Sequence, residues 1–160
     1  MTRKGDLRQL VELRAMRMRR AEEQFQRQHN RHDQAVRTLE TAKAENLVHE
    51  EQRRREEQAL YAGLTQAPVD NRTLERYHNT LYGLDHRARE FEARIHGAAS
   101  SVSHEAQKRE ALSVEYRLKQ KLHDRILILA ERKLHDETRR ADLIDEIDDE
   151  EAIRPKGRKW

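Results

Sequence analysis

The chain has 160 residues, of which 39% are charged and 35% hydrophobic, with two prolines, five glycines and no cysteine. So little apolar material excludes a compact layered core, and the composition is typical of long exposed helices. The lack of cysteine excludes a disulfide framework and thiol chemistry, and suits a soluble protein of the reducing cell interior.

The net charge of +3 conceals an uneven distribution along the chain. Residues 1–20 carry seven basic side chains against two acidic ones, and residues 142–151 carry seven acidic side chains and no basic one. The last residues are basic again. We therefore expect charged partners at the ends of the chain.

The first predicted helix spans residues 6–64, with Asp6 as its N-cap. Apolar side chains recur along it at alternating steps of four and three residues, and no proline interrupts the pattern. This spacing predicts a second helix wound against the first. The expected seam positions are Leu7, Val11, Arg14, Met18, Ala21, Phe25, Gln28, His32, Ala35, Leu39, Ala42, Asn46, His49, Arg53, Glu56, Leu60 and Gly63.

Residues 65–71 form the predicted loop, because Pro68 blocks helix continuation and Asp70 or Asn71 can cap a new helix. The second predicted helix spans residues 72–151, and a basic tail, residues 152–160, follows it. Residues 97–103 are weak helix formers, where we expect a bend or fraying. The second seam comprises Leu74, Tyr77, Leu81, Leu84, Ala88, Phe91, Ile95, Ala98, Val102, Glu105, Arg109, Leu112, Tyr116, Lys119, His123, Ile126, Ala130, Lys133, Glu137, Arg140, Ile144 and Ile147.

A loop this short makes the two helices antiparallel neighbours. The sequence therefore predicts an all-α fold, a single long antiparallel two-helix coiled-coil hairpin. Its register places Leu39 opposite Ala98. Beyond Ala130 the second helix should extend past the first, leaving Ile144 and Ile147 without a partner.

Polar side chains meet at two expected layers of this hairpin, His32 with Glu105 and Gln28 with Arg109. Nearer the loop, polar positions of the first helix face apolar positions of the second. Either the hairpin is soft there or the apolar side chains bind another protein. The expected pairs are Asn46–Phe91, His49–Ala88, Arg53–Leu84 and Glu56–Leu81.

No catalytic, cofactor-binding or metal-binding residue is predicted. His49-Glu50 and His104-Glu105 begin like the zinc motif HExxH, but Arg53 and Lys108 stand where its second histidine is required.

The basic run from Arg14 to Arg20 resembles the basic region of a zipper protein. Such a region precedes its zipper, whereas here the seam runs through it, so nucleic-acid binding is not favoured.

Most aromatic side chains cluster near the loop. They indicate either ordinary seam packing or a binding site for a partner, because aromatic anchors often carry binding energy. The group comprises Tyr61, Tyr77, Leu81, Tyr82, Leu84 and Phe91.

Three features together resemble the YscO/HrpO/FliJ family of type III secretion and flagellar export. They are the basic, leucine-rich opening from Leu7 to Glu22, the Leu-x-x-Tyr-x-x-x-Leu segment from Leu74 to Leu81, and the acidic end of the second helix. The resemblance implies a non-enzymatic stalk like the γ subunit of rotary ATPases. It also implies a cytoplasmic protein, peripheral to the inner-membrane secretion apparatus and not inserted in the membrane.

The resemblance further implies three partners: the hexameric secretion ATPase, an export-gate membrane protein and translocator chaperones. The ATPase would be contacted at the paired ends of the chain, through Leu7, Leu10, Arg14, Arg17, Ile126 and Leu129. The gate or chaperones would be contacted nearer the loop, through Tyr77, Leu81, Leu84 and Phe91. The alternative interpretations are a generic coiled-coil scaffold that oligomerises through its seam and a nucleic-acid binder.

Overall fold

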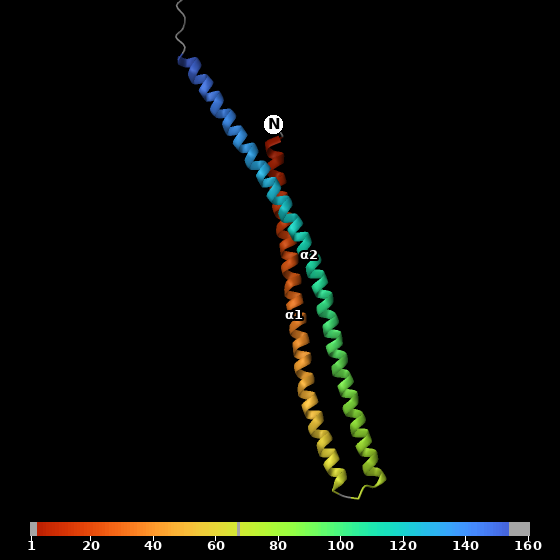
Figure 1. Ribbon diagram of the computed structural model, residues 1–160. Helices are drawn as coiled ribbons and strands as arrows, with labels where there is room; N and C mark the ends of the chain where they lie inside the picture. Colours follow the sequence, from red (N-terminus) through yellow and green to blue (C-terminus); the bar gives the residue numbers. More distant parts are fainter. Residues whose placement is uncertain (1–2, 67, 154–160) are drawn as a thin grey trace, which may run out of the picture. The chain divides into compact units, whose positions relative to one another are not determined.

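The computed structural model describes residues 3–66 and 68–153, which form two helices and, within these ranges, no strand. Helix α1 spans Arg3–Thr65 and helix α2 spans Asn71–Ile153 (Figure 1). The two helices pack against each other in opposite directions, which confirms the all-α two-helix hairpin. The predicted tail from Arg154 onward lies outside the described residues.

The start of each helix tests the predicted caps. Helix α1 begins at Arg3, so Asp6 lies within its first turn and is not the N-cap that was predicted. A carboxylate there is still favourable, because it lies near the positive end of the helix dipole.

Asp70 caps α2. Its Oδ1 accepts the backbone N–H of Thr73 at 2.8 Å, and its carbonyl accepts that of Leu74 at 3.1 Å. The hydrogen bonds from Thr73 hold the pKa of Asp70 below its ordinary value.

The chain divides into two compact units, each built from a part of both helices. Phe25–Leu112 form the loop unit, which contains the connection between α1 and α2. Met1–Gln24 and Ser113–Trp160 form the terminal unit.

The predicted seam of α1 is correct as far as Arg53, and beyond it only the predicted Leu60 is half-buried. Every predicted position from Leu7 to Arg53 is buried or half-buried. After Arg53 the seam passes through Glu57 and Leu64, whereas the predicted Glu56 and Gly63 are exposed. Two successive steps of four residues, from His49 to Arg53 to Glu57, replace the expected four and three. This irregularity is a stutter in coiled-coil terms.

The seam of α2 follows the predicted spacing without a break from Tyr77 to Glu137. Leu74 and Arg140 are exposed, so their prediction as seam residues was wrong. Residues 97–103, where a bend or fraying was expected, lie within one continuous helix.

The predicted extension of α2 past α1 begins later than Ala130. Lys133 and Glu137 are still half-buried, because α1 begins at Arg3, nearly one turn before the predicted start. All residues from Thr138 to Glu151 are exposed.

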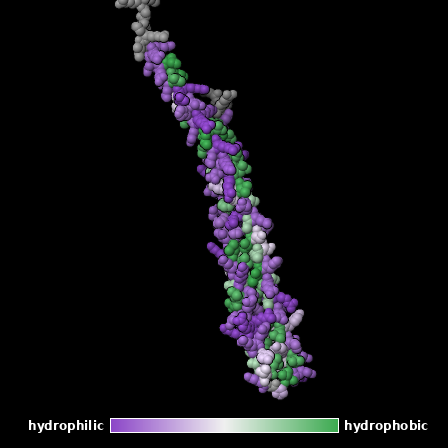
Figure 2. Space-filling model, viewed as in Figure 1, coloured by the Kyte–Doolittle hydropathy of each residue, from purple (hydrophilic) through white to green (hydrophobic). Residues whose placement is uncertain are grey.

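The core of each unit is thin. Among the described residues no side chain is less than 2% exposed, and the buried set is small and half polar. It comprises Ala21, Gln28, Ala42, His49, Leu84 and Ser113. On the face drawn in Figure 2, apolar side chains form separate patches within a mainly polar surface.

Candidate protein-interaction surfaces

Two polar layers of the loop unit are paired across the seam, but not with the predicted partners. The Gln28 side-chain amide donates to a carboxylate oxygen of Glu105 and, at 3.2 Å, to its backbone carbonyl. Arg109 donates to Nδ1 of His32 at 3.2 Å. The expected pairs His32–Glu105 and Gln28–Arg109 are thus exchanged, because side chains of this length reach the neighbouring layer.

Closer to the loop, Arg53 joins the two helices through an ion pair. Its Nε donates to Glu57 at 2.7 Å and its Nη2 donates to Asp85 of α2 at 2.5 Å. The hydrogen bond with Glu57 is the main cause that raises the pKa of Arg53. Leu84 was the predicted partner at this layer, and the guanidinium reaches a carboxylate of α2 instead.

His49 is the most unusual polar residue of the seam. It is only 7% exposed, and neither of its ring nitrogens has a hydrogen-bond partner. Its ring lies 4.7 Å from the ring of Phe91, and the guanidinium of Arg94 lies 5.3 Å from the same Phe91 ring. The imidazole therefore packs as an aromatic side chain, although its predicted neighbour was Ala88.

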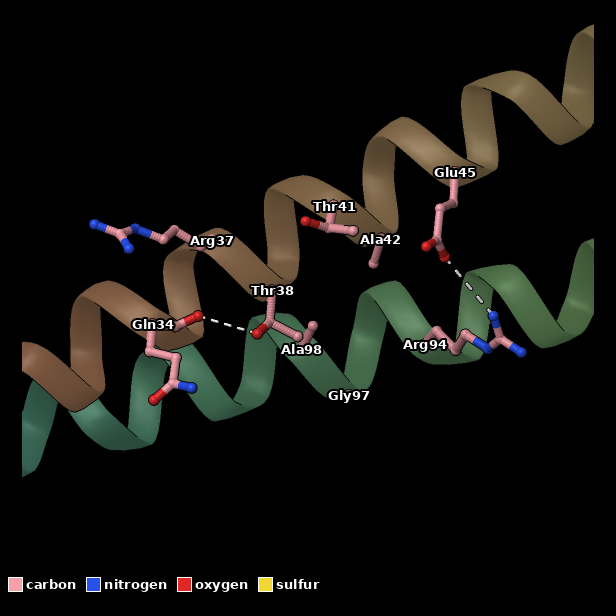
Figure 3. Close-up of a pocket in the computed structure, with 9 residues that line it drawn as sticks. All are labelled: Gln34, Arg37, Thr38, Thr41, Ala42, Glu45, Arg94, Gly97 and Ala98. Atoms are coloured by element: carbon pink, nitrogen blue, oxygen red, sulfur yellow. Dashed lines mark hydrogen bonds and ion pairs between the residues drawn. The ribbon is translucent and has the colours of Figure 1, made fainter.

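A groove of about 520 Å³ runs between the helices farther from the loop, where the seam is built from small side chains (Figure 3). Thr38 and Ala42 of α1 face Gly97 and Ala98 of α2. At one end Glu45 pairs with Arg94 at 3.8 Å. Small residues on both helices leave this part of the surface hollow.

The residues predicted for the gate or chaperone side lie mainly in the seam. Leu84 is 4% exposed, and Tyr77, Leu81 and Phe91 are half-buried. The neighbouring Tyr82, at 71% exposed, points to solvent. The interpretation of these residues as seam packing thus describes where their side chains lie, and their role in binding stays a prediction.

The residues predicted for the ATPase end divide into two groups in the terminal unit. Leu7, Arg14 and Ile126 are half-buried, whereas Leu10, Arg17 and Leu129 are exposed. The Nε of Arg14 is buried without a hydrogen-bond partner. The exposed group is the one that a partner can reach without separating the helices.

Other exposed apolar residues were not singled out from the sequence. Leu13 and Met16 are exposed on α1 in the terminal unit, and Leu47 and Val48 are exposed on α1 in the loop unit. The sequence feature that could have identified them is an apolar residue between two seam positions of an otherwise charged helix.

Neither helix, over the residues that are described, holds a stretch long and apolar enough to cross a membrane. Within the same residues, no group of three or more histidine, aspartate and glutamate side chains is placed to hold a metal ion.

The comparison with known proteins agrees with this architecture. No curated protein matches the chain. A crystal structure of the type III secretion protein YscO from Vibrio parahaemolyticus superposes with a TM-score of 0.78, over 92% of each chain and at 21% identity. At this identity the likeness establishes the fold. The family model of the type III secretion protein YscO matches residues 7–155, which is most of the sequence. The chain therefore belongs to the YscO family of type III secretion proteins.

Proposed function

We propose that this protein is a non-enzymatic stalk and adaptor of a bacterial type III secretion system. Its terminal unit binds the hexameric secretion ATPase, and its loop unit binds the export-gate membrane protein and the translocator chaperones. The supporting observation is the two-helix hairpin of a YscO family member, whose exposed apolar side chains occur in both units. This function places the protein in the cytoplasm, peripheral to the inner membrane.

At the ATPase end, the exposed residues Leu10, Arg17 and Leu129 make the contact in this proposal. Leu7, Arg14 and Ile126 act differently, because their half-buried side chains set the spacing of the two helices. A surface with apolar and basic side chains suits a ring whose inner wall offers both apolar and acidic groups.

On the loop unit, the gate or chaperone contact is made along α2 between Tyr77 and Phe91. Tyr77, Leu81 and Phe91 contribute the exposed edges of half-buried side chains, and the buried Leu84 holds the helix in place. Tyr82 adds the most exposed aromatic ring of this stretch. Exposed tyrosines suit this role because they supply a large contact area with little entropy to lose.

The mechanism is mechanical in this proposal. A two-helix stalk has no rotational symmetry, so it contacts the subunits of a surrounding ring unequally. Unequal contacts favour different nucleotide states in different subunits, which couples the ring to whatever the other unit binds.

Site-specific photo-cross-linking tests the proposal, with a photoreactive phenylalanine placed at Leu10, Leu129 or Tyr82. We expect the first two positions to capture the ATPase and the third to capture the gate protein or a chaperone. The matched control is Val114, which is also exposed but was not assigned to a contact. Recovery of neither ATPase nor gate protein from any of the three positions refutes the function.

A further inference from the structure

We propose that the extension of α2, residues 138–151, packs on the outer face of α1 in a second copy of this chain. The extension is the part of α2 that α1 leaves uncovered. Leu7 and Val11 line a groove with Ala130, Lys133 and Glu137, so the start of α1 lies beside this stretch of α2. Beyond it every residue to Glu151 is exposed.

The uncovered extension carries a row of large apolar side chains. Leu143, Ile144 and Ile147 are 55–57% exposed, and they lie on neighbouring positions of the helix surface. Neighbouring exposed apolar side chains of this size on one helix indicate a contact surface.

The charges of the extension favour a basic partner. Its acidic side chains repel one another at spacings of three and four residues, and they lie at the negative end of the helix dipole. The last turn of α2 holds no basic residue. A basic neighbour would therefore relieve a real cost.

A second copy offers a surface of matching chemistry on α1. Leu10 and Leu13 are exposed there, and Arg17 and Arg20 follow one heptad later on the same face. The acidic counterparts are Glu146 and Glu150, which lie along one side of the apolar row of the extension. An apolar surface next to basic side chains thus meets an apolar surface next to acidic ones.

The proposed contact is reciprocal between the two copies. If the extension of one copy lies on α1 of its partner, two-fold symmetry places the partner's extension on α1 of the first. Both surfaces are then used, and the assembly stops at a dimer instead of growing into a filament. The segment 154–160 is a poorer occupant, because Trp160 is its only large apolar residue.

The dimer covers Leu10 and Arg17, which the proposed function assigns to the ATPase, so it is the form of the chain without the ATPase. The test is the solution mass of the chain alone, which needs no ATPase. At tens of micromolar and low salt, sedimentation should give twice the 19.1 kDa of one chain, and added salt should shift the equilibrium to the monomer. Ile147→Asp should raise the dimer dissociation constant at least about tenfold. Leu47→Asp, at an exposed position of the loop unit, should leave it unchanged.

Charge reversal distinguishes the partner surface. Glu146→Arg with Glu150→Arg should weaken the dimer, and so should Arg17→Glu with Arg20→Glu. A mixture of the two double variants should form heterodimers in which both contacts again join opposite charges. The proposal is overturned by a monomer at every concentration, by a dimer that ignores Ile147→Asp, by failure of the mixture to associate, or by loss of the dimer on removal of residues 154–160. Circular dichroism should show every variant equally helical.

Discussion

Glu105 illustrates how single polar residues define the seam of the loop unit. The hydrogen bond from Gln28 is the main cause that lowers its pKa below the ordinary 4.5. Lys108, one turn away at 3.9 Å, acts in the same direction. The ionised carboxylate is therefore the form that the fold favours.

This environment predicts a defined acid sensitivity. Because the pKa of Glu105 is lowered on folding, its stabilising contribution is complete above its ordinary pKa and is lost as the pH falls through the folded value. Urea unfolding followed by circular dichroism should therefore show a smaller loss of stability between pH 7 and pH 3 in Glu105→Gln than in the unmodified chain. Glu110→Gln, at an exposed position nearby, should behave like the unmodified chain. Equal losses in both variants would contradict the role of Glu105.

Leu84 and Tyr82 lie on one turn of α2, and substitutions at them distinguish a role in packing from a role in binding. Leu84→Ala should lower the free energy of unfolding by about 2–3 kcal/mol, because it removes a buried side chain and leaves a void. Tyr82→Asp should leave stability within about 0.5 kcal/mol of the unmodified chain, since its ring is exposed. It should weaken capture of the gate protein or a chaperone in a pull-down.

The outcome that would change this interpretation is a large loss of helicity in Tyr82→Asp. Its ring would then be part of the packing, and the proposed binding side of α2 would have to be reassigned.

At the scale of the elements, α2 is a single helix although glycine and serine residues interrupt its good helix formers. An added Cβ at Gly97 would meet nothing within 4 Å outside the helix, so glycine is not required there for space. The same holds for Gly83 and Gly63. Glycine at these positions therefore loses conformational entropy on folding, although no steric contact requires a glycine there.

Gly97→Ala should stabilise the protein by about 0.5–1 kcal/mol, because alanine loses less backbone entropy in a helix interior. Chemical unfolding at neutral pH measures the change. Gly63→Ala, two residues before the end of α1, should give a smaller gain, since helix ends fray. A destabilised Gly97→Ala would show that the groove beside it must stay open.

Periodicity alone predicted the seam wherever the steps of four and three continue. It failed at Glu56 and Gly63, because extrapolation cannot see that Arg53 binds Glu57 on one helix and Asp85 on the other. The apolar Leu64, next to Gly63, was the signal that could have corrected it. The pairing of Gln28 with Glu105 and of Arg109 with His32 could not be predicted from the sequence either. Spacing predicts which residues lie at the same height along the hairpin, but not the direction in which a long side chain extends.

At the scale of the whole molecule, stability comes from many shallow contacts. Among the described residues no side chain is fully enclosed, so no single cluster holds the hairpin. Contact residues on the surface could not be predicted from periodicity as the seam was. Leu10, Arg17 and Leu129 were chosen by resemblance, and periodicity had no means of ranking them above Leu13 or Met16.

Pairing within one chain is directly measurable, because the sequence has no cysteine to remove. Spin labels at Ala44→Cys and Glu92→Cys, both exposed positions of the loop unit, should lie within about 30 Å of each other, since packed helix axes are about 8–10 Å apart. The distance should persist when the labelled protein is diluted with unlabelled protein. Its disappearance on dilution would show that the seam joins different chains, as in a generic scaffold.

The stutter at Arg53 has a consequence for anything that grips the loop unit. Two consecutive four-residue steps bring the local repeat to about 11 residues in three turns, which relaxes the left-handed supercoil. Between His49 and Leu64, then, the spacing predicts that α1 runs nearly straight and wraps little around its neighbour. A binding protein could then contact one face of α1 over several helical turns. In a regular supercoil that face would turn gradually around the axis of the hairpin.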